Sequence, residues 1–295
     1  MRALQYVEMA PAAELANVVM TYWGFAIRAL PSPDFMHRVW PDGCASLTLK
    51  FAHGECQLAV VLGATTVAGV VSVRAGEQYW GIRFRPEAGA QFCKRSAQGL
   101  RGQRELARNV FDAPFEILIS ALTNVSDADV ARIALNAFVR EQRATHSKLS
   151  STDSSLQLRS KAATPSTYNE SENATEIDAL SRAEVDSIVR RDGVCSISEI
   201  ASELHVSTRQ LQRRFREATG LTPKAYANIR RARAALKRVA TSQNSQSIGG
   251  WARIAIELGY SDQAHLSREC ARLLSVTPTE LLSTLENITH DRLVD

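Results

Sequence analysis

Five side chains between residues 208 and 216 carry the groups best suited to chemistry in this chain. They are Thr208, Arg209, Gln212, Arg213 and Arg216. Positions three and four residues apart lie on one side of a helix, so these five would share an outward face. Arginine is suited to the O6 and N7 atoms of guanine, and glutamine to the N6 and N7 atoms of adenine. The pattern therefore indicates hydrogen bonding and charge pairing with a nucleic acid.

The charge of the surrounding segment supports a polyanionic partner. From Ser207 to Arg238 the sequence has ten arginines and lysines against a single acid, Glu217, which gives a local net charge of +9. The whole chain carries only +4. A basic stripe concentrated on one element is the electrostatic footprint of nucleic-acid binding. For such a run taken alone, a merely solvated basic face is the alternative.

Two short helices joined by a tight turn would position these side chains. Capping boxes predict the two helix starts, one made by Ser196 with Glu199 and the other by Ser207 with Gln210. Gly220 stands where a left-handed residue ends a helix. The apolar residues at helical spacing are Ile197, Ile200, Ala201 and Leu204 in the first helix, and Leu211, Phe215 and Ala218 in the second. This is the pattern of a helix–turn–helix.

The pattern occurs twice in the chain. The second copy has Trp251, Ile254, Ala255 and Leu258 at the apolar positions of the first helix. Both copies end alike, in Leu221-Thr-Pro223 and Val276-Thr-Pro278, and threonine before proline predicts a further helix start after each. The residues from Pro223 to about Val239 are predicted to form one continuous helix between the copies. Two such units joined by one helix are the organisation of the AraC/XylS DNA-binding domain, which the chain resembles over roughly residues 180–285.

The resemblance implies which side chains contact DNA. It assigns base contact to Thr208, Arg209, Gln212 and Arg213, with Arg216 on the same face, and in the second unit to Gln263, Ala264, Ser267 and Arg268. Arg231, in the linking helix, is expected to contact phosphate and so to position the protein without reading sequence. Phosphate contact alone is the alternative for the others. The implied function is a sequence-specific transcription regulator that reads two successive major-groove segments with two recognition helices.

The second copy departs from the family pattern. Cys270 and Leu274 stand where large aromatic residues are usual, and Ser275 replaces a small turn residue that is often glycine. We expect Cys270 to be a small core residue, with a redox switch as the alternative. The loop from Thr241 to Gly250 is also longer than typical. The sequence leaves open whether this unit binds DNA as the first one does.

The N-terminal part is predicted to be a small antiparallel β barrel or sandwich with helices. The expected strands are Phe35–Trp40, Ala45–Phe51, Gln57–Leu62, Thr66–Val73 and Tyr79–Phe84. The expected helices are an opening one from Pro11 to about Met20, then Glu87 to about Lys94, Pro114 to about Leu122, and Asp127 to about Arg143. The Asp42-Gly43 turn is expected to join the first two strands as a hairpin.

A second resemblance covers about residues 1–140. On Leu15, Tyr22-Trp23, Pro41–Cys44 and Gly81–Pro86, this part resembles an uncharacterised sensor-type domain found ahead of some AraC-family DNA-binding domains. The resemblance implies a regulatory role. Trp23, Trp40, Tyr79 and Trp80 could line an apolar pocket for an effector, although core packing is the commoner role of such residues.

The fold class is thus α+β, in three parts. Residues 1–143 form the N-terminal regulatory domain, residues 144–175 a flexible linker, and residues 176–295 an all-α tandem helix–turn–helix domain. The linker is rich in Ser, Thr, Asn, Gln and Lys and has almost no large apolar residue, so it cannot bury enough surface to offset its ordering entropy.

Enzymatic, metal and membrane functions are not expected. The histidines show no metal-ligand spacing, and the chain has neither a phosphate-binding loop nor a nucleophile elbow. The five cysteines, Cys44, Cys56, Cys93, Cys195 and Cys270, form no C-x-x-C pair, which fits a reducing cytosol. No apolar run reaches the roughly 18 residues of a membrane span. We therefore expect no cofactor, no metal and no catalytic residue.

Double-stranded promoter DNA is the expected partner, in a bacterial cytoplasm, and we expect an activator. RNA polymerase, a small-molecule effector and a second copy of the chain are further partners left open. The alternatives are a DNA-repair alkyltransferase-regulator with a reactive cysteine, and a small-molecule sensor whose DNA binding is secondary. The sequence specifies neither the effector, nor the operator, nor the sign of regulation.

Overall fold

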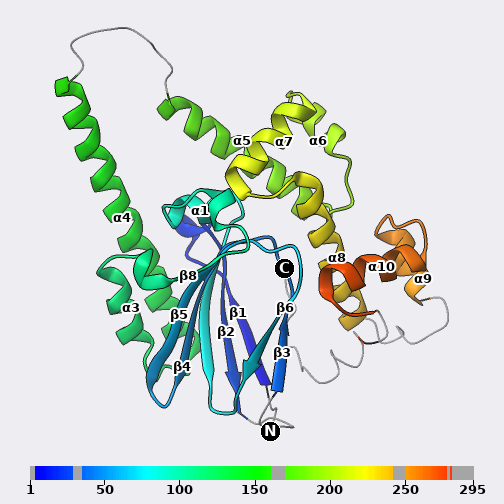
Figure 1. Ribbon diagram of the computed structural model, residues 1–295, viewed down its shortest axis with the longest axis horizontal. Coiled ribbons are helices and arrows are strands. Elements are labelled where there is room, and N and C mark those ends of the chain that lie inside the picture. Colours follow the sequence, from blue (N-terminus) through cyan, green and yellow to red (C-terminus); the bar gives the residue numbers. More distant parts are fainter. Residues whose placement is uncertain (1–3, 29–34, 161–169, 242–249, 278–279, 281–295) are drawn as a thin grey trace.

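The computed structural model describes residues 4–28, 35–160, 170–241, 250–277 and 280 (Figure 1). These residues form a sheet-rich N-terminal part and a helical C-terminal part, which confirms the predicted α+β class. Among them, no helix is both long enough and apolar enough to cross a membrane.

Two antiparallel sheets build the N-terminal part. The larger has the strand order β1-β2-β7-β4-β5-β8, and the smaller pairs β3 with β6. The strands are β1 (Leu4–Met9), β2 (Val19–Ile27), β3 (Phe35–Val39), β4 (Ser46–Ala52), β5 (Glu55–Leu62), β6 (Gly69–Val73), β7 (Gln78–Phe84) and β8 (Arg104–Leu106). In β4 the buried side chains alternate with half-buried ones, so Leu47, Leu49 and Phe51 enter the core from one face.

Helices cover that buried face. The N-terminal helices are α1 (Gly89–Phe92), α2 (Ala97–Leu100), α3 (Pro114–Leu122) and α4 (Ala128–Ser160), with 3₁₀ turns η1 (Ala13–Leu15) and η2 (Ala107–Asn109). Phe92, Phe111, Phe115 and Phe138 meet edge to face or tilted beneath the sheet. This cluster joins α1, α3 and α4 to the strands in one hydrophobic core.

Two glycines let two tryptophans lie across neighbouring strands. Gly24 pairs with Trp80, and Trp23 pairs with Gly81, in the register of β2 and β7. A Cβ atom at Gly81 would lie 2.2 Å from the Trp23 ring, and one at Gly24 would lie 2.3 Å from the Trp80 ring. Each indole therefore occupies the space that a side chain on the partner strand would need.

In the described residues of the C-terminal part, the regular secondary structure is all helical. Its helices are α5 (Glu170–Arg190), α6 (Ile197–Glu203), α7 (Thr208–Thr219), α8 (Pro223–Thr241), α9 (Gly250–Glu257) and α10 (Gln263–Leu274). One core joins α5 to α8, with Leu211, Phe215 and Tyr226 fully buried in it. A second core joins α8 to α9 and α10. The long predicted helix from Pro223 is confirmed as α8.

Several of the secondary-structure predictions are confirmed. The opening helix, the Asp42-Gly43 hairpin and the linker need correction. The five predicted strands appear as β3 to β7, and α3 has the predicted bounds. The opening helix predicted from Pro11 to Met20 is wrong: only η1 forms, and Val19 already begins β2. The run of β-branched and aromatic residues in Val19–Ile27, paired on both sides, outweighs the helix propensity of the preceding alanines. The sequence also failed to predict β1 and β8.

The hairpin predicted at Asp42-Gly43 is also wrong. The turn itself exists, because Gly43 has φ of 73° and the Asp42 carboxylate accepts a hydrogen bond from the Cys44 N–H at 2.9 Å. It carries the chain from one sheet to the other, since β3 pairs with β6 whereas β4 pairs with β5 and β7.

The residues predicted as a flexible linker are helical over most of their described length. Helix α4 continues past Arg143 to Ser160, and α5 starts at Glu170. A polar segment can form a helix when its residues have high helix propensity, as Lys148, Gln157 and Arg159 do. Residues 161–169 lie outside the described part of the chain. The boundaries of the three parts stay a prediction.

Candidate nucleic-acid interface

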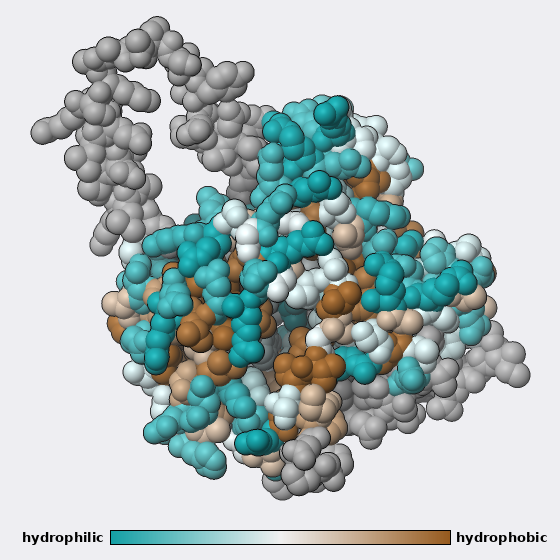
Figure 2. Space-filling model, in the orientation of Figure 1, coloured by the Kyte–Doolittle hydropathy of each residue, from teal (hydrophilic) through white to brown (hydrophobic). Residues whose placement is uncertain are grey.

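Helix α7 presents the predicted reading face. Leu211 and Phe215 are completely buried against α6 and α8, which fixes the rotation of the helix. The opposite face is therefore turned to solvent, and it carries the exposed side chains of Arg209, Gln212, Arg213 and Arg216, with Thr208 half-buried at its start. The molecular surface over α6 and α7 is largely hydrophilic (Figure 2). The structure thus brings the five predicted residues of the first unit together on one face.

The ends of α7 follow the predicted signals. The Ser207 hydroxyl accepts a hydrogen bond from the Gln210 N–H at 3.2 Å. Gly220 adopts the left-handed conformation with φ of 73°, and its N–H donates to the Arg216 carbonyl at 2.9 Å. The cap predicted for α6 is wrong: Ser196 makes no side-chain cap, and its hydroxyl instead shares a hydrogen bond with Ser198 at 2.6 Å. A second hydroxyl two residues away competes for the capping oxygen.

The second unit is complete despite its unusual residues. The Asp262 carboxylate caps α10 by accepting a hydrogen bond from the His265 N–H at 2.6 Å, and this bond lowers the pKa of Asp262. Cys270 is fully buried, as predicted for a core residue, and its burial raises the pKa of the thiol to about 12. Ser275 takes the left-handed conformation with φ of 56°, the role that Gly220 has in α7. Helix α10 therefore ends normally without glycine.

The predicted contact residues of α10 lie on its outer side. Gln263, Ala264 and Arg268 are exposed, and Ser267 is half-buried. Leu266, on the inner side, is fully buried in the core shared with α8 and α9. The loop that was noted as unusually long, residues 242–249, lies outside the described chain, as do residues 281–295, where the helix after Pro278 would continue.

Arg231 has a position unlike that of the other nine predicted residues. It is half-buried on α8, where its guanidinium lies 4.3 Å from the centroid of the Tyr260 ring. It also donates a hydrogen bond to the Asn228 Oδ1 atom at 3.2 Å. Arg231 thus packs between the linking helix and the second unit. The sequence could not indicate this contact, because it depends on how α9 and α10 fold back on α8.

A hollow of about 590 Å³ adjoins the reading face of α7. It is lined by Ser207, Arg209, Gln210, Gln212, Arg213, Arg216 and Glu217 from the first unit and by Gln98 from α2. Three guanidinium groups face one carboxylate there. The N-terminal part therefore reaches the edge of the surface predicted to bind DNA.

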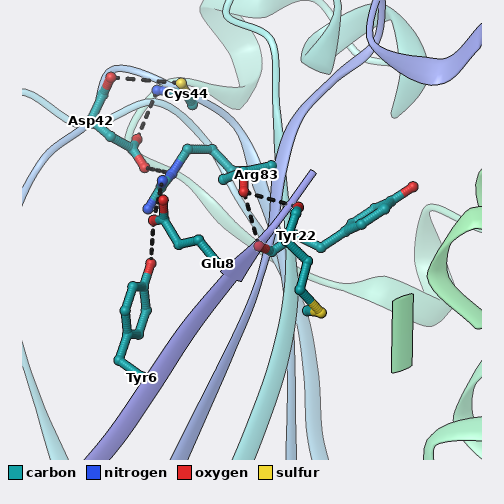
Figure 3. Close-up of polar contacts among 8 residues, drawn as sticks. Tyr6, Glu8, Tyr22, Asp42, Cys44 and Arg83 are labelled. Carbon is teal, nitrogen blue, oxygen red and sulfur yellow. Dashed lines mark hydrogen bonds and ion pairs between the residues drawn. The ribbon is translucent and has the colours of Figure 1, made fainter. Parts of the chain in front are cut away.

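The N-terminal part contains a polar network around Arg83 that sequence reasoning did not identify (Figure 3). The Arg83 guanidinium donates to Asp42 at 2.6 Å and to Glu8 at 3.0 Å, and the Tyr6 hydroxyl donates to the same Glu8 carboxylate at 2.5 Å. Arg233 of α8 lies close enough that burial, followed by the charge of Arg83, lowers its pKa. Asp42 is therefore the turn former that was predicted and also an ion-pair partner.

The four aromatic residues that could have lined one pocket are dispersed. Trp80 is buried in the main core and donates a hydrogen bond to the Val125 carbonyl at 3.3 Å. Trp23 and Tyr79 pack against a small cluster around Phe25, whereas Trp40 packs against the core of α8 to α10. The structure does not bring them together.

The thiols of Cys44 and Cys93 are buried. Burial raises the pKa of Cys93 to about 12 and raises that of Cys44 as well, so both thiols stay protonated at neutral pH. Within the described ranges, no group of three or more His, Cys, Asp or Glu side chains could hold a metal ion.

Two family models match the chain, one in its C-terminal part and one in its N-terminal part. Residues 200–284 match the model of a helix-turn-helix domain, and residues 7–105 match that of a domain of unknown function, DUF6597. No curated protein matches the chain.

Solved structures give weak likenesses. A transcriptional regulator with an AraC-type DNA-binding domain from Chromobacterium violaceum is 21% identical, covering 38% of this chain and 96% of its own, with a TM-score of 0.33. ToxT from Vibrio cholerae is 11% identical, covering 97% of this chain and 99% of its own, with a TM-score of 0.38. ToxT with a bound unsaturated fatty acid is 12% identical, covering 98% and 97%, with a TM-score of 0.36.

Proposed function

We propose that the chain is a DNA-binding transcription regulator that reads two successive major-groove segments with α7 and α10. The match of residues 200–284 to a helix-turn-helix domain, behind a DUF6597 domain, supports this proposal. The observation that carries this proposal is the likeness of the two helices. Each has 12 residues, a side-chain cap at its start and a left-handed residue at its end. Each also turns polar side chains outward from a buried apolar stripe.

The length of α8 supports simultaneous reading. Its 19 residues span about 28 Å at 1.5 Å per residue. Successive major-groove segments on one side of the duplex lie about 34 Å apart. The width of the units flanking α8 supplies part of the difference, and a modest DNA bend supplies the rest. One chain would then cover two half-sites about one helical turn apart.

The exposed side chains suggest how bases are distinguished. Arg209 and Arg213 suit guanine, and Gln212 suits adenine. In the second unit, Arg268 and Gln263 have the same chemistry, Ala264 suits the thymine methyl group, and Ser267 accommodates either a donor or an acceptor. Arg216, one turn further along α7, is placed for a phosphate.

We further propose that the N-terminal part regulates DNA binding. The support is its direct contact with α5, α7 and the end of α10. The five cysteines are free, which fits the reducing cytoplasm of a bacterium. An effector, RNA polymerase and a second copy of the chain are candidate partners in this regulation. We propose activation as its sign.

Binding of the full chain to the DNA upstream of its own gene tests the proposal. Fluorescence anisotropy would be recorded at two salt concentrations against a scrambled duplex of the same composition. We expect preference for the upstream DNA and an affinity that falls steeply with salt, because several phosphates are neutralised. Equal affinity for both duplexes would contradict sequence reading. Absence of binding to either duplex, both by the full chain and by variants that loosen the contact between its two parts, would contradict the function as a whole.

A further inference from the structure

Helix α2 of the N-terminal part lies against the C-terminal end of the reading helix α7 (Figure 1). The contact is close: a Cβ atom at Gly220 would lie 2.5 Å from the Ala97 carbonyl oxygen and 3.5 Å from the Arg101 Cβ atom. The next residue of α2, Gln98, is exposed and lines the same hollow as Arg209 and Arg213. The backbone of α2 is therefore packed beside the DNA-reading face.

That position leaves little room on this side of α7 for a DNA duplex. The major groove is about 12 Å wide and 8.5 Å deep, and a helix with its side chains is about 10–12 Å across. A recognition helix therefore fills the groove, and the two phosphate backbones close against its flanks. Since Gln98 shares a hollow with Arg209 and Arg213, a duplex seated on α7 would have to approach α2 closely.

The second reading helix is held at the corresponding end. Arg38 of β3 donates a hydrogen bond to the carbonyl of Ser275 at 2.6 Å. The N–H of Ala68, just before β6, donates to the carbonyl of Leu273 at 2.8 Å. Gly220 and Ser275 are the left-handed residues that end α7 and α10, so the N-terminal part contacts both reading helices at the same structural position.

Ion pairs and a hydrogen bond also join the N-terminal part to α5. Arg85, which follows β7, pairs with Asp186 of α5 at 2.5 Å. Arg182 of α5 donates to the Asn17 carbonyl at 3.1 Å and lies 3.6 Å from the buried carboxylate of Glu87. None of these residues lines the hollow beside the reading face. The two parts can therefore be loosened by substitutions that leave the DNA-contacting side chains intact.

We propose that the docked N-terminal part is autoinhibitory: it keeps α2 beside α7 and holds the ends of both reading helices, so specific DNA binding requires its release. The proposal rests on the function proposed above and adds the mechanism by which the N-terminal part controls it. The docked and DNA-bound arrangements exclude each other, so any change that weakens docking raises the affinity for DNA.

Two substitutions of opposite charge test the proposal in the full chain. Arg38→Gln removes a positive charge and the hydrogen bond to Ser275, whereas Asp186→Asn removes a negative charge and the pair with Arg85. Simple electrostatics would make the first weaken and the second strengthen DNA binding. The proposal expects both to strengthen it by about two- to five-fold, as fits the loss of one partly exposed polar contact. The double variant should gain on the order of ten-fold.

Matched controls carry the same charge changes without an interface contact. Arg28→Gln removes an exposed guanidinium that donates a hydrogen bond to Gln5, and Asp129→Asn removes an exposed carboxylate that pairs with Arg132. Neither should increase affinity for the upstream duplex. Hydrogen–deuterium exchange without DNA would report docking, with faster exchange expected in residues 97–103 and at the end of α7 for the interface variants alone.

The outcomes separate the two proposals. If the wild type prefers its upstream DNA and the interface variants exchange faster yet bind no more tightly, the autoinhibitory contact is refuted and the DNA-reading function stands. If Arg38→Gln weakens binding as Arg28→Gln does, docking is likewise irrelevant. If the wild type binds no DNA but the double variant does, autoinhibition is supported. If neither the wild type nor the double variant binds DNA, both proposals fail.

Discussion

The guanidinium of Arg231 lies 4.3 Å from the centre of the Tyr260 ring and so ties the linking helix α8 to the second helix–turn–helix unit. Tyr260 is almost fully buried, and its burial raises the pKa of its hydroxyl to about 12. The Arg231 guanidinium therefore faces an uncharged, buried aromatic ring. This contact, together with the core shared by α8, α9 and α10, holds the second unit against α8.

Replacing Arg231 with alanine should lower the stability of the helical part. A half-buried cation–π contact contributes about 0.5–2 kcal/mol, which the variant would lose. Urea unfolding followed by circular dichroism measures the change. Lys224→Ala, an exposed change on the same helix, is the control and should alter stability by less than about 0.5 kcal/mol. Equal unfolding free energies of the two variants would show that Arg231 has no structural role.

Replacing Arg213 with alanine should reduce specific binding without affecting folding. A good bidentate contact to guanine supplies about 1–3 kcal/mol of discrimination, so the variant should lose preference at one base pair. Binding to a panel of single-base operator variants would locate that pair. Arg253→Ala, an exposed arginine on the non-reading helix α9, should change affinity for all the duplexes alike. A uniform loss with Arg213→Ala would assign it to phosphate instead.

Glu184 should make stability fall as the pH rises. Its side chain is fully buried on α5 without a hydrogen-bond partner for either oxygen, and burial raises its pKa to about 8. The folded protein holds the proton, whereas the unfolded chain releases it near pH 4.3. The stabilising contribution is complete below about pH 4 and is lost as the pH rises through about 8.

Glu184→Gln removes this titration. Relative to wild type, the variant should gain on the order of 1 kcal/mol of unfolding free energy for each pH unit between about 5 and 8. Glu199→Gln, an exposed change on α6, should show no such trend. Parallel pH profiles for wild type and Glu184→Gln would show that Glu184 is ionised in the folded state.

Gly81→Ala should destabilise the sheet. The new Cβ atom would lie 2.2 Å from the Trp23 ring, and displacing that indole should cost about 1–3 kcal/mol. Gly69→Ala in β6 is the matched change, because no heavy atom lies within 4 Å of its Cβ position. Thermal unfolding should show a large decrease in Tm for the first variant and little change for the second.

Local signals made much of the helical part predictable. The Ser207 cap, the left-handed Gly220 and the apolar spacing of Leu211 and Phe215 act within one or two turns, so the sequence is sufficient to identify α7. The outward face followed directly from the buried one. Pairing between strands is a long-range property, and the alanine-rich segment before Val19 gave the wrong local signal.

The contacts between the two parts could not be predicted at all. Arg38 and Ser275 are separated by 237 residues, and neither has a type or a neighbour that indicates the other. Gly220 is a second example. The sequence explains its glycine by the left-handed conformation that ends α7, but the missing side chain also leaves room for the backbone of Ala97. A residue can satisfy a local rule and a distant packing requirement together, and the sequence shows only the first.

Helix α8 is uninterrupted from Pro223 to Thr241, and in the proposed function this continuity would constrain the spacing of the half-sites that the protein reads. A rigid connection cannot lengthen when the DNA between two half-sites lengthens. One inserted base pair turns the second half-site by about 35° around the duplex axis, out of reach of α10. Regulation through the N-terminal part would then change how often a promoter is occupied, while the spacing of its half-sites stays the same.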